Sequence, residues 1–341
     1  MVVAEPGQQR SKAELTADIR ARRRTALVVN VRSRRGRRHY PTVCRQLHHA
    51  GLDLLDLHPV ADPRRLPQAL AAAVDSGADL IVVGGGDGTL SEAAHQLAHR
   101  DLCLGVLPLG TTNNFARSLG LPLHLPAAVQ ILTEGKVADV DLGHVAGRHF
   151  ANLTSLGLSV QVAQHVPHQL KRILGRAAYP LTALALLPRH RPFTARLRIN
   201  HGTANDGDDG TTADDGTGGT DGTARGVHEL VTHQLNIANG SHHAGRAIAR
   251  DTGLDDRQLV IYQLGDAHRL RLTLATVRQT VTGPHRPLAH SPFLTARHVW
   301  LHTDPPMDLD VDGEIRGRTP AQITLEANAL RVMVATDFPD V

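Results

Sequence analysis

The sequence has no run of about 18 to 20 apolar residues, the length that a helix needs to cross a bilayer. Its first residues also lack the positively charged start, apolar core and small-residue cleavage site of a secretory signal. Only two of the 341 residues are cysteine, Cys44 and Cys103, and they lie far apart in the sequence, so no disulfide framework is indicated. We therefore expect a cytoplasmic protein of a reducing compartment that does not span a membrane.

Two common functional signatures are absent as well. The 22 histidines show neither a His-Glu-x-x-His motif nor a paired Cys/His spacing, and we assign them no metal. No Lys-Ser or Lys-Thr pair follows a glycine loop, which excludes the Walker A type of nucleotide loop, and a Gly-x-Gly-x-x-Gly fingerprint with its later ribose-binding acid is not convincing.

Positive charge is unevenly distributed. The formal net charge is only +4, but arginine is concentrated between residues 20 and 38. Such a cluster could attract anionic lipid head groups, nucleotide phosphate or nucleic acid, and near an anionic bilayer each basic residue contributes about 1 kcal/mol. A solvated basic tail explains the composition equally well. The members of the cluster are Arg20, Arg22, Arg23, Arg24, Arg32, Arg34, Arg35, Arg37 and Arg38.

The first part of the chain predicts an α/β domain. We expect residues 1–24 to be a disordered basic tail with at most a short polar helix near Leu15. From residue 25 to 144, continuous aliphatic runs alternate with helical stretches, which is typical of a parallel sheet covered on both faces. This predicts a three-layer domain. The expected strands lie at 26–31, 52–57, 80–83 and 103–107, and the expected helices at 39–50, 66–76, 90–99 and 126–134.

The second part predicts an antiparallel β-sandwich over residues 145–319, because apolar and polar residues alternate in most of its segments. Residues 170–187 predict an amphipathic helix with a basic start. Residues 202–226 are rich in Gly, Asp and Thr and predict a disordered acidic insertion. The last strand, within 320–341, is expected to rejoin the first domain.

The strongest chemical signal is the segment Gly84-Gly85-Gly86-Asp87-Gly88-Thr89, which follows a buried strand and opens a helix. Backbone N–H groups and the positive end of a helix dipole bind phosphate at such a place, and glycine lets the anion approach the backbone. The plainer alternative is a tight strand-to-helix turn, and the capping box of Thr89 and Glu92 that belongs to it is expected as well. It does not explain the run of glycines followed by Asp-Gly.

These residues resemble the nucleotide-binding signature of the diacylglycerol kinase catalytic-domain family, which includes sphingosine and ceramide kinases and soluble bacterial lipid kinases. The segment Leu104–Arg117, with Gly110-Thr111-Thr112, is similar to the second motif of these lipid kinases and unlike that of NAD kinases. Further similarity covers about residues 26–334, including Asp312-Gly313-Glu314. The resemblance implies an NAD-kinase-like N-terminal domain, a C-terminal β-sandwich and a cleft between them.

The resemblance also implies roles for particular residues. Gly84, Gly85, Gly86, Gly88 and Thr89, with Thr111, would hold ATP; Asp87, with Asp141, would organise Mg²⁺; and Glu314 would be the general base that takes the proton of a lipid hydroxyl. Asn30 is a further candidate nucleotide contact, although the family's first motif has altered spacing here. Asp256 is the one side-chain candidate for a structural Mg²⁺ site, and a plain surface turn is equally open.

We therefore expect an ATP-dependent lipid kinase that acts on a hydroxyl of a membrane lipid, such as diacylglycerol or a sphingoid base. Peripheral docking at an anionic membrane surface is expected, with no nucleic-acid partner, and a homodimer is left open. Two alternatives remain. One is an NAD kinase, and the other is a catalytically weak lipid- or nucleotide-binding regulator.

Overall fold

A computed structural model describes the fold of most of the chain, which forms two compact units. Unit 1 comprises Met1–Leu153, Ala238–Arg257 and Glu326–Val341, and unit 2 comprises Thr154–Ile237 and Gln258–Leu325. No helix of the described part is long and apolar enough to cross a membrane. The described residues are 9–166, 178–186, 190–200, 227–240, 242–243, 246–247, 254, 257–264 and 294–339.

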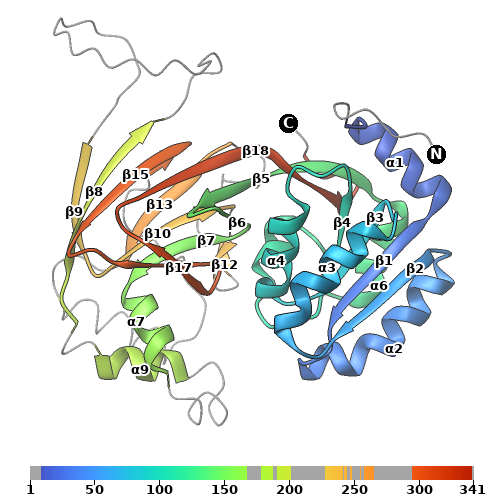
Figure 1. Ribbon diagram of the computed structural model, residues 1–341, viewed down its shortest axis with the longest axis horizontal. Coiled ribbons are helices and arrows are strands. Elements are labelled where there is room, and N and C mark those ends of the chain that lie inside the picture. Colours follow the sequence, from blue (N-terminus) through green and yellow to red (C-terminus); the bar gives the residue numbers. More distant parts are fainter. Residues whose placement is uncertain are drawn as a thin grey trace, which may run out of the picture. The chain divides into compact units, whose positions relative to one another are not determined.

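Unit 1 is built on a parallel sheet in which β2, β1, β3, β4 and the end of β18 lie side by side (Figure 1). β1, β3 and β4 are buried along most of their length, which explains their continuous aliphatic sequences. These strands agree with those predicted from the sequence. Their bounds are β1 Arg24–Asn30, β2 Asp53–Val60, β3 Leu80–Gly85, β4 Cys103–Pro108 and β18 Ala321–Val334.

Helices cover both faces of this sheet and enclose two apolar clusters. On one face, α3, α4 and α5 pack against Ala26, Ile81 and Leu104. On the other, α1, α2 and α6 pack against Leu27 and Val82. The three-layer α/β fold is thus confirmed. The helices are α1 Lys12–Arg22, α2 Arg34–His49, the 3-10 turn η1 Pro63–Arg65, α3 Leu66–Asp75, α4 Asp87–Leu97, α5 Asn114–Ser118 and α6 Leu125–Glu134.

Helix α1 corrects the expectation of a disordered tail for residues 9–24, the described part of the predicted tail 1–24. Leu15 and Ile19, one turn apart, are buried against the sheet. The helix begins with a capping box, in which Ser11 accepts from the backbone N–H of Glu14 and the Glu14 side chain accepts from the backbone N–H of Ser11. Two apolar residues are therefore enough to fix a helix whose other side chains are mostly polar.

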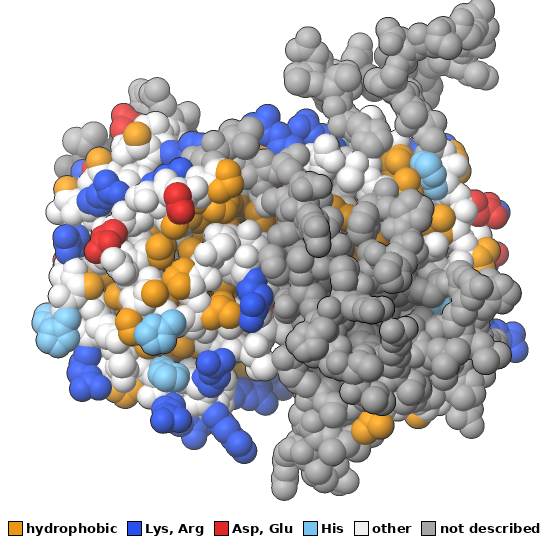
Figure 2. Space-filling model, turned by 180° about the vertical axis from the view of Figure 1, so that it is seen from behind, with side chains coloured by type: hydrophobic (Ala, Val, Ile, Leu, Met, Phe, Trp, Pro, Cys, Tyr) orange, Lys and Arg blue, Asp and Glu red, His pale blue; other side chains and the backbone are white. Residues whose placement is uncertain are grey.

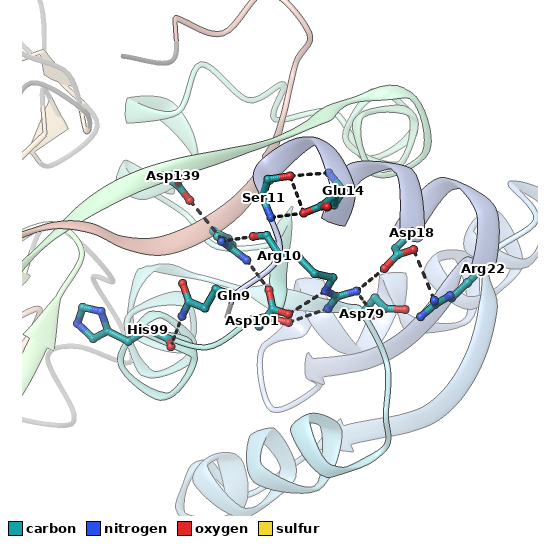
Figure 3. A network of polar contacts seen from close by, with 11 residues as sticks. Gln9, Arg10, Ser11, Glu14, Asp18, Arg22, Asp79, His99, Asp101 and Asp139 are labelled. Carbon is teal, nitrogen blue, oxygen red and sulfur yellow. Dashed lines mark hydrogen bonds and ion pairs between the residues drawn. The ribbon is translucent and has the colours of Figure 1, made fainter. Parts of the chain in front are cut away.

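Ionic contacts hold the same N-terminal segment in place (Figure 3). The Arg10 guanidinium donates to Asp18, Asp79 and Asp101 at 2.8 Å each, and Gln9 donates to the backbone oxygen of His99 at 2.7 Å. These bonds outweigh the opposing effect of burial, so the pKa of Arg10 is raised and its charge is permanent. The segment before α1 is thus fastened to the loops that enter β3 and β4.

Two further segments complete unit 1. The hairpin of β5 (Lys136–Val145) and β6 (Arg148–Phe150) extends the sheet through β18. A second segment, Ala238–Arg257, carries the small hairpin of β11 (His242–His243) and β12 (Arg246–Ala247). The sequence predicted that this segment belongs to the second domain. It groups with unit 1 because Asn239 donates to the backbone oxygen of Asp141, and Asp141 donates its N–H to Leu254.

Unit 2 contains two layers of antiparallel strands, which confirms the predicted sandwich. One layer has the order β14-β13-β10-β7-β16-β17, and the other joins β9, β8 and β15 to the beginning of β18. The described residues of unit 2 also contain α7 Leu158–His165 and α9 Ala178–Leu186. The strands are β7 Leu153–Gly157, β8 Phe193–Asn200, β9 Val227–Thr232, β10 Gln234–Asn239, β13 Leu259–Leu264, β14 Leu294–Ala296, β15 His298–Asp304, β16 Asp308–Val311 and β17 Glu314–Arg318.

Strand β18 contributes to both units. Its first residues, Ala321–Thr324, pair with β15 in unit 2, whereas Val332 pairs with Leu104 of β4 in unit 1. The predicted insertion 202–226 and the basic start of the helix at 170–187 lie outside the described residues.

Candidate active site

The glycine segment lies at the carboxyl end of β3. β3 ends at Gly85, Gly86 is the N-cap of α4 without any side-chain cap, and the helix begins at Asp87. The capping-box alternative is therefore wrong. Thr89 accepts a hydrogen bond from the Asn30 side chain at 3.1 Å, and Glu92 pairs with Arg148 instead.

The first turn of α4 leaves hydrogen-bond donors available. The N–H groups of Thr89 and Leu90 bond to the oxygen of Gly86, but in the part of the chain that the structure describes, no hydrogen bond uses the N–H of Asp87 or Gly88. Gly88 is exposed, and a Cβ added to it would meet no atom within 4 Å. Glycine at this position is not required by packing within the chain, which leaves room for an anion at the positive end of the helix dipole.

The second motif packs directly on the first. A Cβ added to Gly110 would lie 2.4 Å from the Cα of Gly86 and 2.6 Å from Oδ1 of Asn113, so only glycine permits this approach. Asn113 adopts the left-handed conformation, with φ of 50°, and its Oδ1 accepts from the N–H of Gly110 at 2.9 Å. The two segments that the sequence identified separately therefore meet backbone to backbone.

Asp87 joins the two motifs through its carboxylate. One oxygen accepts from the Thr112 hydroxyl at 2.7 Å, and the other accepts from the N–H of Phe115 at 3.2 Å. A carboxylate has about four acceptor positions, so both bonds leave capacity for a metal ion or its water. Thr111, a predicted ATP contact, is exposed in the turn between Gly110 and Thr112.

Asn30 reaches the same place from the end of β1. Besides its bond to Thr89, its Oδ1 accepts from the N–H of Arg32 at 3.2 Å. Gly36 is needed here because an added Cβ would lie 1.9 Å from the backbone oxygen of Asn30, and Ser33 caps α2 by accepting from the N–H of Gly36. The altered spacing of this segment therefore still brings Asn30 to the glycine loop.

Two arginines at this site were not predicted as site residues, although Arg35 belongs to the arginine cluster that could attract nucleotide phosphate. Arg35 donates to the backbone oxygen of Gly110 at 2.7 Å, and Arg117 donates to that of Thr112 at 2.9 Å. The signal was present, since both arginines follow the ends of parallel strands, which meet at one edge of a sheet.

The arginine cluster of residues 20–38 is not one surface. Arg20, Arg22, Arg23 and Arg24 lie at or before the start of β1, whereas the members from Arg32 onward follow its end. The seven residues of β1 separate the two groups by about 20 Å. On the face shown in Figure 2, Lys and Arg side chains are likewise spread over several places rather than gathered in one patch.

Asp141 is buried on β5, with 1% of its surface exposed. Its two carboxylate oxygens accept from the backbone N–H groups of Arg257 and Asn328, each at 2.9 Å. These bonds tie β5 to two distant segments, so the structure gives Asp141 a positioning role, and its predicted contribution to Mg²⁺ stays a prediction. Asp256, the predicted structural metal ligand, lies outside the described residues.

Glu314 stands on unit 2 at the start of β17. The β16–β17 hairpin turns at Asp312 and Gly313, whose φ angles of 49° and 93° fit a two-residue turn of type I′. The Asp-Gly pair of the motif is thus explained by the turn, and only Glu314 is left for chemistry. Its exposed carboxylate accepts from Arg316 at 2.8 Å.

A second carboxylate lies beneath this turn. Asp310 is 9% exposed and accepts from the N–H of Gly313 at 2.6 Å. Burial raises the pKa of Asp310, and the neighbouring carboxylates of Asp312 and Glu314 act in the same direction, while the bond from Gly313 opposes them. The turn that precedes Glu314 is therefore fixed by the hydrogen bond to Asp310, a buried carboxyl group with a raised pKa.

Comparison with known proteins agrees with this arrangement. The family described as the diacylglycerol kinase catalytic domain matches residues 24–145, and the YegS C-terminal NAD kinase beta sandwich-like domain matches residues 152–334. The chain is 31% identical over 283 residues to a Pseudomonas aeruginosa protein named "probable lipid kinase YegS-like", covering 82% of this chain and 83% of the relative. It is 29% identical over 247 residues to the diacylglycerol kinase of Bacillus subtilis, covering 72% and 74%.

A solved structure shows the same fold. The diacylglycerol kinase from Bacillus anthracis superposes with a TM-score of 0.68 at 23% identity, covering 92% of this chain and 97% of that chain. At this identity the likeness shows the fold alone. The matched domains and relatives carry the assignment: the chain belongs to the diacylglycerol kinase and YegS-like lipid kinase family, and it is a lipid kinase.

Proposed function

We propose that the phosphoryl donor is ATP and that its phosphates bind at the start of α4. One observation carries the proposal: the exposed Gly88 has open space where a Cβ would stand, beside N–H groups that no described residue uses. The guanidinium groups of Arg35 and Arg117 supply positive charge near the same loops. Asn30, Thr89 and Thr111 complete the proposed nucleotide contacts.

The acceptor that we propose is the hydroxyl of a membrane lipid, with diacylglycerol first, because several relatives are named diacylglycerol kinase. The lipid oxygen attacks the γ-phosphorus, the bond from that phosphorus to the β–γ bridging oxygen breaks, and ADP leaves. Glu314 takes the proton of the hydroxyl. A sphingoid base or another long-chain alcohol offers the same reacting group.

Mg²⁺ is proposed as the metal that neutralises the phosphate charge. Asp87 fits the ion because its carboxylate keeps acceptor capacity and stands in the turn where the phosphates are proposed to bind. The other residues of the site serve to position the donor phosphate and the acceptor hydroxyl, since phosphoryl transfer depends mainly on alignment and charge neutralisation.

A radiolabel assay tests the reaction. The purified protein is incubated with γ-labelled ATP, Mg²⁺ and mixed micelles of one lipid at a time: diacylglycerol, a sphingoid base, a long-chain alcohol or a glycolipid. We expect label in the organic extract, strongest for diacylglycerol. Label in NAD rather than in any lipid would overturn the proposal in favour of an NAD kinase, and ATP binding without transfer to any lipid would favour a regulator.

The role of Glu314 is tested by Glu314→Gln against the matched variant Asp312→Asn. Both remove one carboxylate from the same hairpin, and asparagine tolerates the left-handed conformation of residue 312. We expect Glu314→Gln to lower kcat about 10² to 10⁴-fold with ATP affinity within a few fold, and Asp312→Asn to remain near wild type. Near-wild-type kcat in Glu314→Gln would remove this residue from the mechanism.

We further propose that the protein is cytoplasmic and meets its lipid at an anionic membrane surface. The proposal is supported by the substrate, which hardly leaves a bilayer, and by the basic residues Lys171, Arg172 and Arg176 in the sequence. Binding to vesicles should require anionic lipid and weaken with added salt. It should also fall when these three residues are changed to glutamate, whereas equal binding to neutral vesicles would contradict the proposal.

A further inference from the structure

Three histidines surround Glu326 in unit 1, away from the glycine loop, and a fourth, His95, contacts one of them. His95 lies in α4, His99 just after it, His144 in β5 and His149 in β6. Nε2 of His99 and Nε2 of His149 lie 2.6 and 2.8 Å from the same carboxylate oxygen of Glu326, and Nδ1 of His144 lies 3.7 Å from the other. The chain thus gathers three imidazoles around one carboxylate, a set of potential metal ligands that the sequence spacing did not reveal.

The fold holds these side chains in place. His144 and His149 are directly opposite each other in the β5–β6 hairpin, and their rings lie 5.0 Å apart. The backbone N–H of His99 donates to Ala329 of β18 at 2.7 Å, and the backbone oxygen of His99 accepts from Gln9, as Figure 3 shows. A site built on such fixed backbone loses little entropy when it binds an ion.

The cluster is separate from the proposed nucleotide site. Asp87 begins α4, and His95 and His99 lie at and beyond its last turn. A helix of eleven residues is about 16 Å long, so the two ends cannot serve one phosphate group. The kinase chemistry therefore gives no reason for four imidazoles here.

The contacts of His149 leave a place for a proton or a metal ion between its Nε2 and Glu326. The backbone N–H of His149 donates to Nδ1 of His95 at 3.3 Å, so that Nδ1 is an acceptor. Nδ1 of His149 is also 3.3 Å from it, and two bare nitrogens would repel each other, so this pair of contacts favours the tautomer of His149 that carries its proton on Nδ1. A neutral His149 then directs the lone pair of Nε2 at a carboxylate oxygen only 2.8 Å away. That contact is favourable only with a proton or a metal ion between the two atoms.

The ligand types and spacing favour a metal ion. One ligand atom from each of His99, His149 and Glu326 lies within 4.8 Å of the others. Tetrahedral zinc, at about 2.0–2.1 Å from nitrogen and oxygen, separates its ligands by about 3.3 Å, so shifts of about 1 Å would form the site. The contact between His95 and Nδ1 of His149 resembles the hydrogen bonds by which residues outside a ligand set orient a metal-binding imidazole.

We propose that His99, His149 and Glu326 bind one divalent cation of the Zn²⁺ class, with His144 placed to supply a fourth ligand. Two imidazoles and one carboxylate suit such borderline cations, whereas Mg²⁺ and Ca²⁺ prefer oxygen ligands alone. The ion fastens the end of α4, the β5–β6 hairpin and β18 to one another. It acts on the stability of unit 1 rather than on the transferred phosphate.

Calorimetric titration of the chelator-treated, dialysed full chain with Zn²⁺ tests this site without nucleotide or lipid. We expect one tight equivalent that is weakened at least about tenfold by Glu326→Gln, His149→Gln or His99→Asn. Asparagine suits residue 99 because its φ is 59°. The matched control His48→Gln removes an exposed imidazole of the same unit and should bind like the wild type.

Two further measurements distinguish a specific metal site from weak binding to scattered surface histidines. Zn²⁺ should raise the melting temperature of the wild type and of His48→Gln but not that of Glu326→Gln, and Co²⁺ should give the visible absorption of a tetrahedral site. Circular dichroism confirms that each variant is folded. Equal Zn²⁺ affinity in all variants, no saturable binding, or an equal stabilisation by Mg²⁺ would each overturn the proposal.

Discussion

Two glycines of the candidate site have opposite environments. Replacing each by alanine adds one methyl group, which tests packing at one position and ligand binding at the other. Gly110 faces the backbone of Gly86, where an added Cβ would lie 2.4 Å from Cα, whereas Gly88 faces open space. Ordinary carbon–carbon contacts are about 3.5–4.0 Å, so Gly110→Ala must push the two loops apart by about 1 Å or more.

The expected effects follow from these distances. Overpacking of this kind costs about 1–3 kcal/mol, and each kcal/mol lowers Tm by about 2–4 °C in a domain of 150–250 residues. Gly110→Ala should therefore lower Tm even without any ligand. Gly88→Ala lies in the first turn of α4, where alanine favours a helix, and should leave Tm unchanged or slightly raised. It should nevertheless weaken ATP binding at least about tenfold, or 1.4 kcal/mol, because the methyl group occupies the space proposed for phosphate.

Differential scanning fluorimetry without nucleotide and calorimetry with ATP measure the two effects on the same preparations. A Gly88→Ala protein that binds ATP like the wild type would refute the proposed position of the phosphates, even if the protein proves to be an active kinase. An unchanged Tm in Gly110→Ala would show that the two motifs do not pack as the structure has them.

Three further predictions concern the scaffold. Arg10→Ala should lower the free energy of unfolding by about 2 kcal/mol, because it leaves the carboxylate of Asp79 unpaired. The control Arg22→Ala removes an exposed arginine 3.6 Å from Asp18 and should change the free energy of unfolding by less than about 0.5 kcal/mol. Equal effects of the two variants in urea titrations would contradict the network of Figure 3. Asp141→Asn should lower the free energy of unfolding by about 1–3 kcal/mol, because one of the two oxygens that accept from backbone N–H groups becomes an NH2 group. An unaltered urea midpoint would contradict this prediction. Burial lowers the pKa of His149 despite the opposing effect of Glu326, so the unfolded chain binds the proton more tightly than the folded chain. Without added metal, the free energy of unfolding should therefore fall as the pH decreases below about 6.5, by up to about 1.4 kcal/mol per pH unit, and Tm should fall with it. A pH slope unchanged in His149→Gln would exclude this histidine as its source.

The sequence predicted those parts of the fold whose signals are local. Buried aliphatic strands such as β3 and alternating strands such as β8 carry their burial pattern in four to eight residues; β3 lies where it was expected, and β8 lies in the part predicted to be antiparallel sheet. Only a short polar helix near Leu15 was expected where α1 lies, and its packing was missed because its apolar side is only Leu15 and Ile19; the capping box of Ser11 and Glu14 was a local signal for its start. The start of α2 was placed too late because the first turn is rich in arginine and Pro41 lies inside the helix.

The candidate site shows the same division between local and distant signals. The glycine loop could be read from its own residues, because strand, glycines and helix follow one another along the chain. The contact of Gly86 with Gly110, the bond of Arg35 to Gly110 and the histidines around Glu326 join residues 24 to 227 positions apart. Such contacts depend on strand register and on how whole helices and strands pack together, which cannot be read from a single sequence.

The double membership of β18 has a consequence for synthesis on the ribosome. Unit 1 begins with the first helix, but the strand that lies beside β4 comes from residues 326–334, after the whole of unit 2. At about 5–20 residues per second, the emerging chain must wait on the order of ten to thirty seconds between Leu153 and Glu326 with one edge of that sheet unpaired. During that interval the exposed edge of β4 is a template for wrong partners, so a chaperone that shields it would act before translation ends.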